Sequence, residues 1–210
     1  MELYGWRSKL NQLLEWSMML AYLNFLWMAG ILLGAGIAGV FPATVAMFSV
    51  MRKWIQDGDL HINVFSHFKQ EYKKEFFKAN LYGYLWVIVG VIIYVDLQFF
   101  RGFSSLWSLI FSFFFFILAV IYLAALLFAF PVYVQYQLSL SQYVKNSVFI
   151  ALSNPIFTIL VALGFYFPYL LMSKVPGLLP FFGGSLIAIV VMKLSHNLFT
   201  ILEKKVCEGS

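Results

Sequence analysis

Long stretches without a charged residue dominate the pattern of hydrophobic and polar positions along this chain. Continuous apolar runs of about 20 residues are typical of transmembrane helices, because a helix satisfies its backbone hydrogen bonds within one segment. A transmembrane barrel would instead alternate apolar and polar residues over about ten positions. The pattern therefore predicts an all-α, polytopic membrane helix bundle. It predicts six transmembrane helices, at residues 13–33, 37–55, 81–99, 106–130, 156–172 and 178–194.

The first two of these helices come from one apolar tract, residues 13–55, which is 43 residues long. One membrane crossing rarely takes more than about 25 residues. The tract contains Gly34, Gly36 and Gly39, followed by Pro42. Glycine permits a tight turn, and proline suits the first turn of a new helix. We therefore expect a hairpin of two spans with Pro42 opening the second. A single broken or half-inserted segment, giving five spans, remains the alternative.

The distribution of basic residues favours the hairpin, because cytoplasmic loops of membrane proteins carry an excess of Lys and Arg. With six helices and the N-terminus inside, 12 of the 14 Lys and Arg residues lie on the inner side, and only Arg101 and Lys174 lie outside. With five helices and the N-terminus outside, the division of these 14 residues is 10 to 4. We expect a multi-pass protein of the cell membrane with both termini in the cytoplasm.

Composition supports the same class of protein. Of the residues, 62% are hydrophobic and 11% are charged, whereas an ordinary soluble domain has about 25% charged residues. The loops are too short to hold a soluble domain, so residues 1–210 are predicted to form a single integral membrane domain. Residues 1–11 lack the features of a signal peptide, and the first apolar segment is expected to remain in the mature protein.

The most polar stretch, residues 56–80, contains an amphipathic pattern. Aromatic residues recur there at spacings of three and four, with lysines between them, which predicts an interfacial helix in the first cytoplasmic loop. Its rings would enter the membrane and its lysines would face the anionic headgroups of the inner leaflet. The same pattern also serves the positive-inside rule alone. The candidate partner- or lipid-contacting residues are Phe65, Phe68, Lys69, Tyr72, Lys73, Lys74, Phe76 and Lys78.

Ionisable residues within the membrane are rare and are candidates for function. Asp96 lies near the outer end of the predicted third span, and Arg101 follows five residues later. We expect the two to form an intramembrane or interfacial ion pair. A proton or substrate site would need a second buried ionisable group, and the sequence offers none.

The sequence gives no support for catalysis or for a cofactor. Cys207 is the single cysteine, and the three histidines are scattered without the spacing of metal ligands. No phosphate-binding loop, nucleophile elbow or carboxylate pair is evident. We therefore expect no enzyme activity, no cofactor, no metal and no nucleic-acid partner.

Several motifs resemble those of the YesL-like family of bacterial integral membrane proteins, a domain of unknown function. These motifs are AYLNFLWMAG at 21–30, GVFPATVAMFSVMRKW at 39–54, FSHFKQEYKKEFFKAN at 65–80 and QLSLSQYVKNSVFIAL at 137–152. Genes of this family often neighbour those of sugar-importing ABC transporters. The resemblance therefore implies an accessory role in carbohydrate uptake, with permease subunits as partners. It implies no catalytic residue.

Two functions from different classes remain. The first is a non-enzymatic accessory membrane subunit associated with a bacterial ABC-type oligosaccharide or sugar importer. The second is a small independent membrane transporter or channel. A transporter is expected to bring polar groups together at mid-membrane, often on broken helices.

Overall fold

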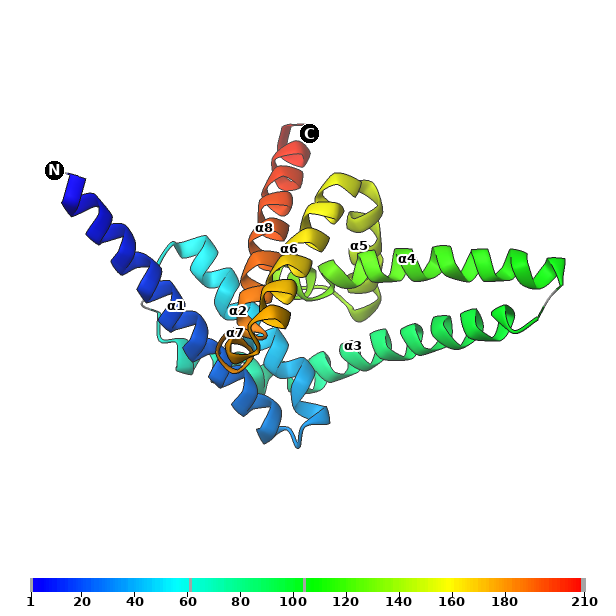
Figure 1. Ribbon diagram of the computed structural model, residues 1–210, viewed down its shortest axis with the longest axis horizontal. Coiled ribbons are helices and arrows are strands. Elements are labelled where there is room, and N and C mark those ends of the chain that lie inside the picture. The colour runs from blue at the N-terminus through cyan, green and yellow to red at the C-terminus, as the bar shows by residue number, and fades with distance from the viewer. Residues whose placement is uncertain (1, 61, 104, 209–210) are drawn as a thin grey trace.

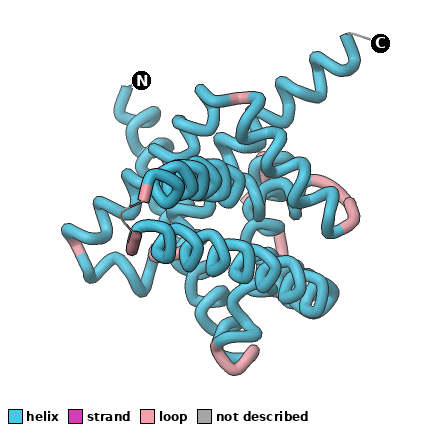
Figure 2. Tube along the Cα trace, turned by 90° about the vertical axis from the view of Figure 1, so that its right-hand side faces the viewer, coloured by secondary structure: helices cyan, strands magenta, loops and turns pink. Residues whose placement is uncertain are grey.

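A computed structural model describes residues 2–60, 62–103 and 105–208 of the chain. Helices form nearly all of these ranges, and short turns separate them (Figure 2). No strand occurs in the described ranges, so the all-α prediction is confirmed. Short 3-10 segments lie at Ile37–Gly39 and Pro176–Leu178. The helices are α1 (Glu2–Leu33), α2 (Val40–Asp57), α3 (Val64–Arg101), α4 (Leu106–Gln135), α5 (Leu140–Ser153), α6 (Pro155–Lys174), α7 (Leu179–Phe182) and α8 (Ser185–Glu208).

Five segments are long and apolar enough to cross a membrane, which supports the multi-pass prediction. They are Leu10–Leu33, Val64–Arg101, Leu106–Gln135, Pro155–Lys174 and Ser185–Lys205. The predicted second span corresponds to α2, which has 18 residues and includes three charged ones, Arg52, Lys53 and Asp57. A membrane crossing by α2, and with it the count of six, stays a prediction.

The break between α1 and α2 lies at the glycines that the sequence singled out. Gly36 has a φ of +79° and Ala35 a φ of 54°, both in the left-handed region. Glycine adopts this region without steric cost. The left-handed backbone at these two positions turns the chain within the three residues between α1 and the 3-10 segment. A Cβ atom on Gly34 would overlap the backbone of Gly39, so the turn is also close-packed. Pro42 is the third residue of α2, in its first turn.

The interfacial helix that the amphipathic pattern predicts, residues 61–80, is not a separate element in the described residues, outside which residue 61 lies. Residues 64–80 are helical, but they continue without a break into the predicted third span, and together they form the 38-residue helix α3. No proline or glycine interrupts the chain between Asn63, whose side chain caps the helix by accepting a hydrogen bond from the Ser66 amide, and Gly83. At about 1.5 Å per residue α3 is about 57 Å long, almost twice the hydrocarbon core of about 30 Å.

Helix α2 lies at the centre of the packed part of the molecule. Ala46, Val50 and Met51 are fully buried, and Trp54 is buried as well. The Trp54 ring meets the edge of Trp16 on α1, with ring centroids 6.0 Å apart. Helices α1, α3, α4 and α8 pack around α2, and α2 is therefore buried on several sides.

The start of α8 is fixed by a side chain from α1. Asn24 is completely buried, and its Oδ1 accepts hydrogen bonds from the amides of Gly184 (2.9 Å) and Ser185 (3.2 Å). Its Nδ2 donates to the Pro180 carbonyl at 2.8 Å. The first amides of a helix lack partners within the helix. The Asn24 side chain supplies a hydrogen-bond partner for amides at the start of α8, and it thereby joins α1 to α8.

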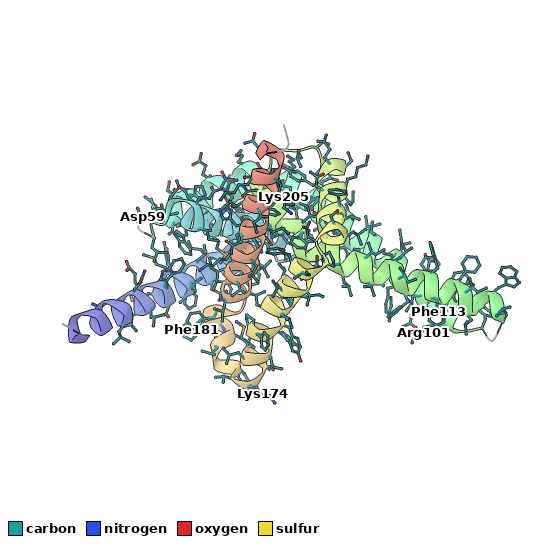
Figure 3. All side chains as sticks on the ribbon, turned by 90° about the horizontal axis from the view of Figure 1, so that it is seen from above. Asp59, Arg101, Phe113, Lys174, Phe181 and Lys205 are labelled. Atoms are coloured by element: carbon teal, nitrogen blue, oxygen red, sulfur yellow. The ribbon has the colours of Figure 1, made fainter. Side chains whose placement is uncertain are left out.

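Helices α3 and α4 form a hairpin that projects from the rest of the molecule (Figure 1). We call its outer part, residues 87–101 and 106–120, the arm. Of the arm residues only Ser108 is buried. Figure 3 places Arg101 and Phe113 toward the far end of this hairpin. The arm is therefore held by the packing of its two helices on each other.

Candidate functional site

A polar pocket of about 630 Å³ lies where α2, the first half of α3 and the end of α4 meet. It contrasts with the apolar surface of most of the molecule. Both signs of charge and several tyrosine rings face it. Its lining includes Ser49, Arg52, Lys53, Gln56, Asp57, His67, Glu71, Lys74, Glu75, Lys78, Tyr133, Tyr136, Gln137 and Tyr143.

Carboxylates from one face of α3 form the acidic part of the pocket. Glu71 and Glu75 are spaced four residues apart, and Lys74 lies 3.9 Å from the first and 3.5 Å from the second. The hydroxyl of Tyr133 on α4 donates a hydrogen bond of 2.7 Å to Oε2 of Glu75. This bond is charge-assisted, which makes it stronger than one between neutral groups. It ties α3 to α4 beside the pocket.

Lys78 connects three helices at the inner wall. Its Nζ donates to the Leu138 carbonyl at 3.2 Å and lies 3.5 Å from the Tyr143 hydroxyl. It also lies 5.6 Å and 5.0 Å from the ring centroids of Tyr133 and Tyr143, which stack on each other at 4.6 Å. A cation close to aromatic faces is stabilised by the ring quadrupoles. No carboxylate pairs with Lys78 in the described part of the chain.

Arg52 of α2 satisfies the end of α4. Its guanidinium donates to the carbonyls of Val134 and Gln135, in the last turn of α4. The last carbonyls of a helix lack intrahelical partners and carry partial negative charge, so a cation is favourable there. Next to this contact, burial and the nearby carboxylate of Glu203 raise the pKa of Tyr136 to about 12. The Tyr136 hydroxyl therefore stays protonated at neutral pH.

Ser49 and His67 form a further link across the pocket. Oγ of Ser49 lies 3.1 Å from Nε2 of His67, a spacing that also occurs between a nucleophile and its base. Both residues lie within helices, however, and helix-interior amides are used in the backbone ladder. They are not free to form an oxyanion hole of the kind that acyl transfer needs. The pair is best explained as a polar contact that holds α2 to α3.

The pocket residues do not assemble a metal centre. No group of three His, Cys, Asp or Glu side chains is close enough to bind a metal ion in the ranges that the structure describes. Arg52, Glu75 and Lys78 bind groups of neighbouring segments, and Lys74 pairs with Glu71 and Glu75 of its own helix, so the pocket is a polar junction on the packed part of the molecule.

The structure separates the eight residues of the predicted amphipathic face. Phe68 is buried, and Tyr72 donates a hydrogen bond of 2.8 Å to the Gly30 carbonyl of α1. Tyr72 also contacts the rings of Phe68 and Phe76. Tyr72 thus contacts both other rings and α1. Phe65 is exposed, with Lys69 5.9 Å above its ring, and Lys73 is exposed.

Two of the predicted lysines, Lys74 and Lys78, line the polar pocket. The sequence pattern indicated these two lysines by their charge, but it did not indicate the residues that they contact. Glu75, Tyr133 and Tyr143 were missed. Glu71 and Glu75 share one helical face with Lys74 and Lys78, which is a detectable signal. The tyrosines come from another helix pair, and nothing local marks them.

Asp96 and Arg101 do not form an ion pair in the structure. Salt bridges between described residues involve Lys74 with Glu71 and Glu75, and the helix carrying Asp96 continues as far as Arg101. Residues five positions apart on a helix point in different directions, whereas those three or four apart are neighbours. The pairing would have required the helix to end earlier. Arg101 instead lies on the lining of a shallow pocket at the tip of the arm, with Phe100 and Phe113.

The arm offers the second candidate surface, and it is apolar. Its exposed side chains are large, and many are aromatic, including Phe99, Trp107, Phe113 and Phe116. A projecting pair of apolar helices with five apolar segments of spanning length defines the class of this protein: a multi-pass helical membrane protein.

Comparisons with known proteins show the family to which the chain belongs. A family model described as "Protein of unknown function, DUF624" matches residues 20–97. Three proteins of Bacillus subtilis (strain 168) are similar over most of their length. "Uncharacterized protein YteU" is 36% identical over 97% of this chain and 91% of its own. "Uncharacterized protein YesV" is 34% identical over 82% of this chain and 83% of its own.

The third relative, "Uncharacterized protein YesL", is 32% identical over 93% of this chain and 92% of its own. The chain therefore belongs to the YesL-like DUF624 family of membrane proteins, as its motifs indicated. No solved structure matches it.

Proposed function

We propose that this protein is a non-enzymatic accessory membrane subunit that docks on another multi-pass membrane protein through its arm. The observation that carries the proposal is the exposure of the arm: within residues 87–101 and 106–120 only Ser108 is buried. The arm residues with exposed apolar side chains include Val91 (54% exposed), Val95 (55%) and Ile110 (48%).

The packing of the arm favours a protein partner. Helices in membranes associate through close van der Waals packing, because lipid tails are as apolar as leucine. The two helices of the arm pack on each other alone, while α2 has neighbours on several sides. The helices around α2 give it contacts on several sides. A partner protein packed against the arm would give the arm such contacts.

The predicted cytoplasmic side of the protein offers polar contacts beside the apolar arm. Interfaces combine an apolar centre with a polar rim. Lys69 and Lys73 are exposed on the first half of α3, the same helix that continues into the arm. With both termini cytoplasmic, these lysines face the inner leaflet, where anionic lipids attract them.

An independent transporter has less support. A transporter site needs polar groups that are available to a substrate between the spans. Asn24, the buried amide between α1 and α8, uses its oxygen and nitrogen to bind backbone groups around the start of α8. Arg52, Lys74, Glu75 and Lys78 of the polar pocket are likewise bonded to backbone carbonyls or to other side chains of the pocket. These contacts favour a structural over a transporting role.

The permease of an ABC-type oligosaccharide or sugar importer is the partner we propose. Its support is the membership in the YesL-like family, whose genes often neighbour those of such importers. The three relatives bear names that state no partner.

The proposal is tested by blocking the arm with a bulky apolar side chain. Val95→Trp enlarges an arm residue that is 55% exposed, and Ile159→Trp does so at a residue of α6 that is 61% exposed. Lipid accommodates either change, whereas a packed helix interface tolerates overpacking poorly. After mild-detergent purification from native membranes, Val95→Trp is expected to lose the co-purifying permease and Ile159→Trp to retain it. Equal recovery with both variants, or recovery of no permease with the unmodified chain, would contradict the proposal.

A further inference from the structure

A large apolar groove of about 970 Å³ runs between the helices on the packed part of the molecule. It differs from the polar pocket in its chemistry, and it adjoins the arm at Val87. All five segments of spanning length, together with α2, contribute to its walls. Its lining includes Trp27, Phe41, Trp86, Tyr122, Ala162 and Val191.

The groove has little to offer a polar ligand. The Thr44 hydroxyl donates to the Val40 carbonyl at 2.7 Å and accepts from Trp27 Nε1 at 3.1 Å. The Tyr122 hydroxyl donates to the Trp86 carbonyl at 2.9 Å, and that of Thr158 donates to the Ala151 carbonyl at 2.8 Å. These hydroxyls are used within the protein. The Tyr166 hydroxyl and the buried Trp86 Nε1 are the polar side-chain groups of the lining that have no hydrogen bond among the described residues. No charged residue lines the groove.

Water is also a poor occupant for a groove of this kind. A buried water needs two to four polar partners, and an apolar cavity excludes it. Apolar walls without an occupant would lose the dispersion contacts that a packed interior provides. The groove therefore requires an apolar occupant, and its position between the spanning segments places it where hydrocarbon is the solvent.

We infer that the groove binds an acyl chain of a membrane phospholipid. The flexible chain of a lipid adapts to walls built from several helices, and it needs no hydrogen bond along its length. Ala124, Ala162 and Ala188 are small residues on the lining, whereas Gly83 and Gly184 accommodate two aromatic rings of the wall. A Cβ on Gly83 would overlap the Phe41 ring, and one on Gly184 would lie 3.1 Å from the Trp27 ring. The bound chain completes the packing among the helices.

The test fills the groove with a side chain of this protein. Ala162→Phe adds a ring on the lining, and Ala29→Phe adds the same ring at an exposed position of α1 outside it. The chain is purified alone in detergent and washed, and the phospholipid that stays bound is measured by mass spectrometry. Thermal unfolding is then recorded with and without added phosphatidylglycerol.

The unmodified protein and Ala29→Phe are expected to retain phospholipid and to unfold at a higher temperature when phosphatidylglycerol is added. Ala162→Phe is expected to lose most of the retained lipid and the response to added lipid. Its unfolding temperature without lipid should match or exceed that of the unmodified protein, which distinguishes a filled groove from a damaged fold.

Two outcomes would overturn the inference. One is retained lipid and an unchanged lipid response in a folded Ala162→Phe variant, which would assign the lipid to another surface. The other is no retained phospholipid and no lipid response of the unmodified protein. Loss of the permease from Ala162→Phe in native membranes would then assign the groove to a protein partner. Loss of partner binding through Val95→Trp is independent of both.

Discussion

The hydroxyl of Tyr133 on α4 and the carboxylate of Glu75 on α3 lie 2.7 Å apart and share a hydrogen bond. The two helices form one hairpin, and this bond lies at its base, beside the polar pocket. Tyr133 also stacks on Tyr143 of α5, with ring centroids 4.6 Å apart. The Tyr133–Glu75 contact thus joins the part of α3 that lines the pocket to the helix that returns from the arm.

Removing the Tyr133 hydroxyl is expected to weaken the fold. Tyr133→Phe keeps the ring stack but leaves Glu75 without this donor, and losing a hydrogen bond to a charged group costs about 1–3 kcal/mol. We expect a lower unfolding temperature in detergent. Tyr169→Phe, at a position 57% exposed whose hydroxyl has no hydrogen bond among the described residues, is the matched control and should change little. Equal stability of both variants would show that the Tyr133–Glu75 bond contributes nothing measurable.

Gly83 is predicted to be required because Phe41 of α2 packs against it. A Cβ at this position would overlap the Phe41 ring, so Gly83→Ala should lower the unfolding temperature. Overpacking typically costs about 1–3 kcal/mol. Phe41→Ala should also be destabilising, but adding Gly83→Ala to it should cost less than in the unmodified protein. Additive effects in this double-mutant cycle would contradict the close contact.

The topology remains to be measured, because α2 decides whether the chain crosses five or six times. The test uses single cysteines at Asn11, Gly102 and Lys204, all exposed in the structure, in a Cys207→Ser background. With six crossings, an impermeant thiol reagent applied to intact cells should label position 102 and leave positions 11 and 204 unlabelled. Labelling at 11 and 102 but not at 204 would favour five crossings instead.

Much of the fold was accessible from the sequence, and the reasons are local. Hydrophobic run length predicts helices directly, and the glycines between 34 and 39 locate the turn into α2. The continuity of α3 was harder to foresee. Charged residues become rare after residue 80, but no residue there breaks the helix. The pattern therefore resembled the boundary between two helices, although one helix continues from a polar into an apolar environment.

Only part of the polar pocket could be predicted from the sequence, because its residues come from distant parts of the chain. Lys74 and Lys78 stood out by charge, but Tyr133 belongs to an apolar run and Arg52 to the end of another. Their roles depend on which helix faces which. Asp96 and Arg101 show the opposite error: proximity along the chain suggested a pair that the helical geometry separates.

The most direct test of the central claim is site-specific photo-crosslinking in native membranes. A photoreactive amino acid is placed at Ile110 on the arm, which is 48% exposed, or at Ile159 on α6, which is 61% exposed. If the arm is the docking surface, irradiation at position 110 should yield a covalent product that contains the permease of a sugar importer, and position 159 should yield much less of it. Products of equal yield from both positions, or lipid adducts alone from position 110, would contradict the account.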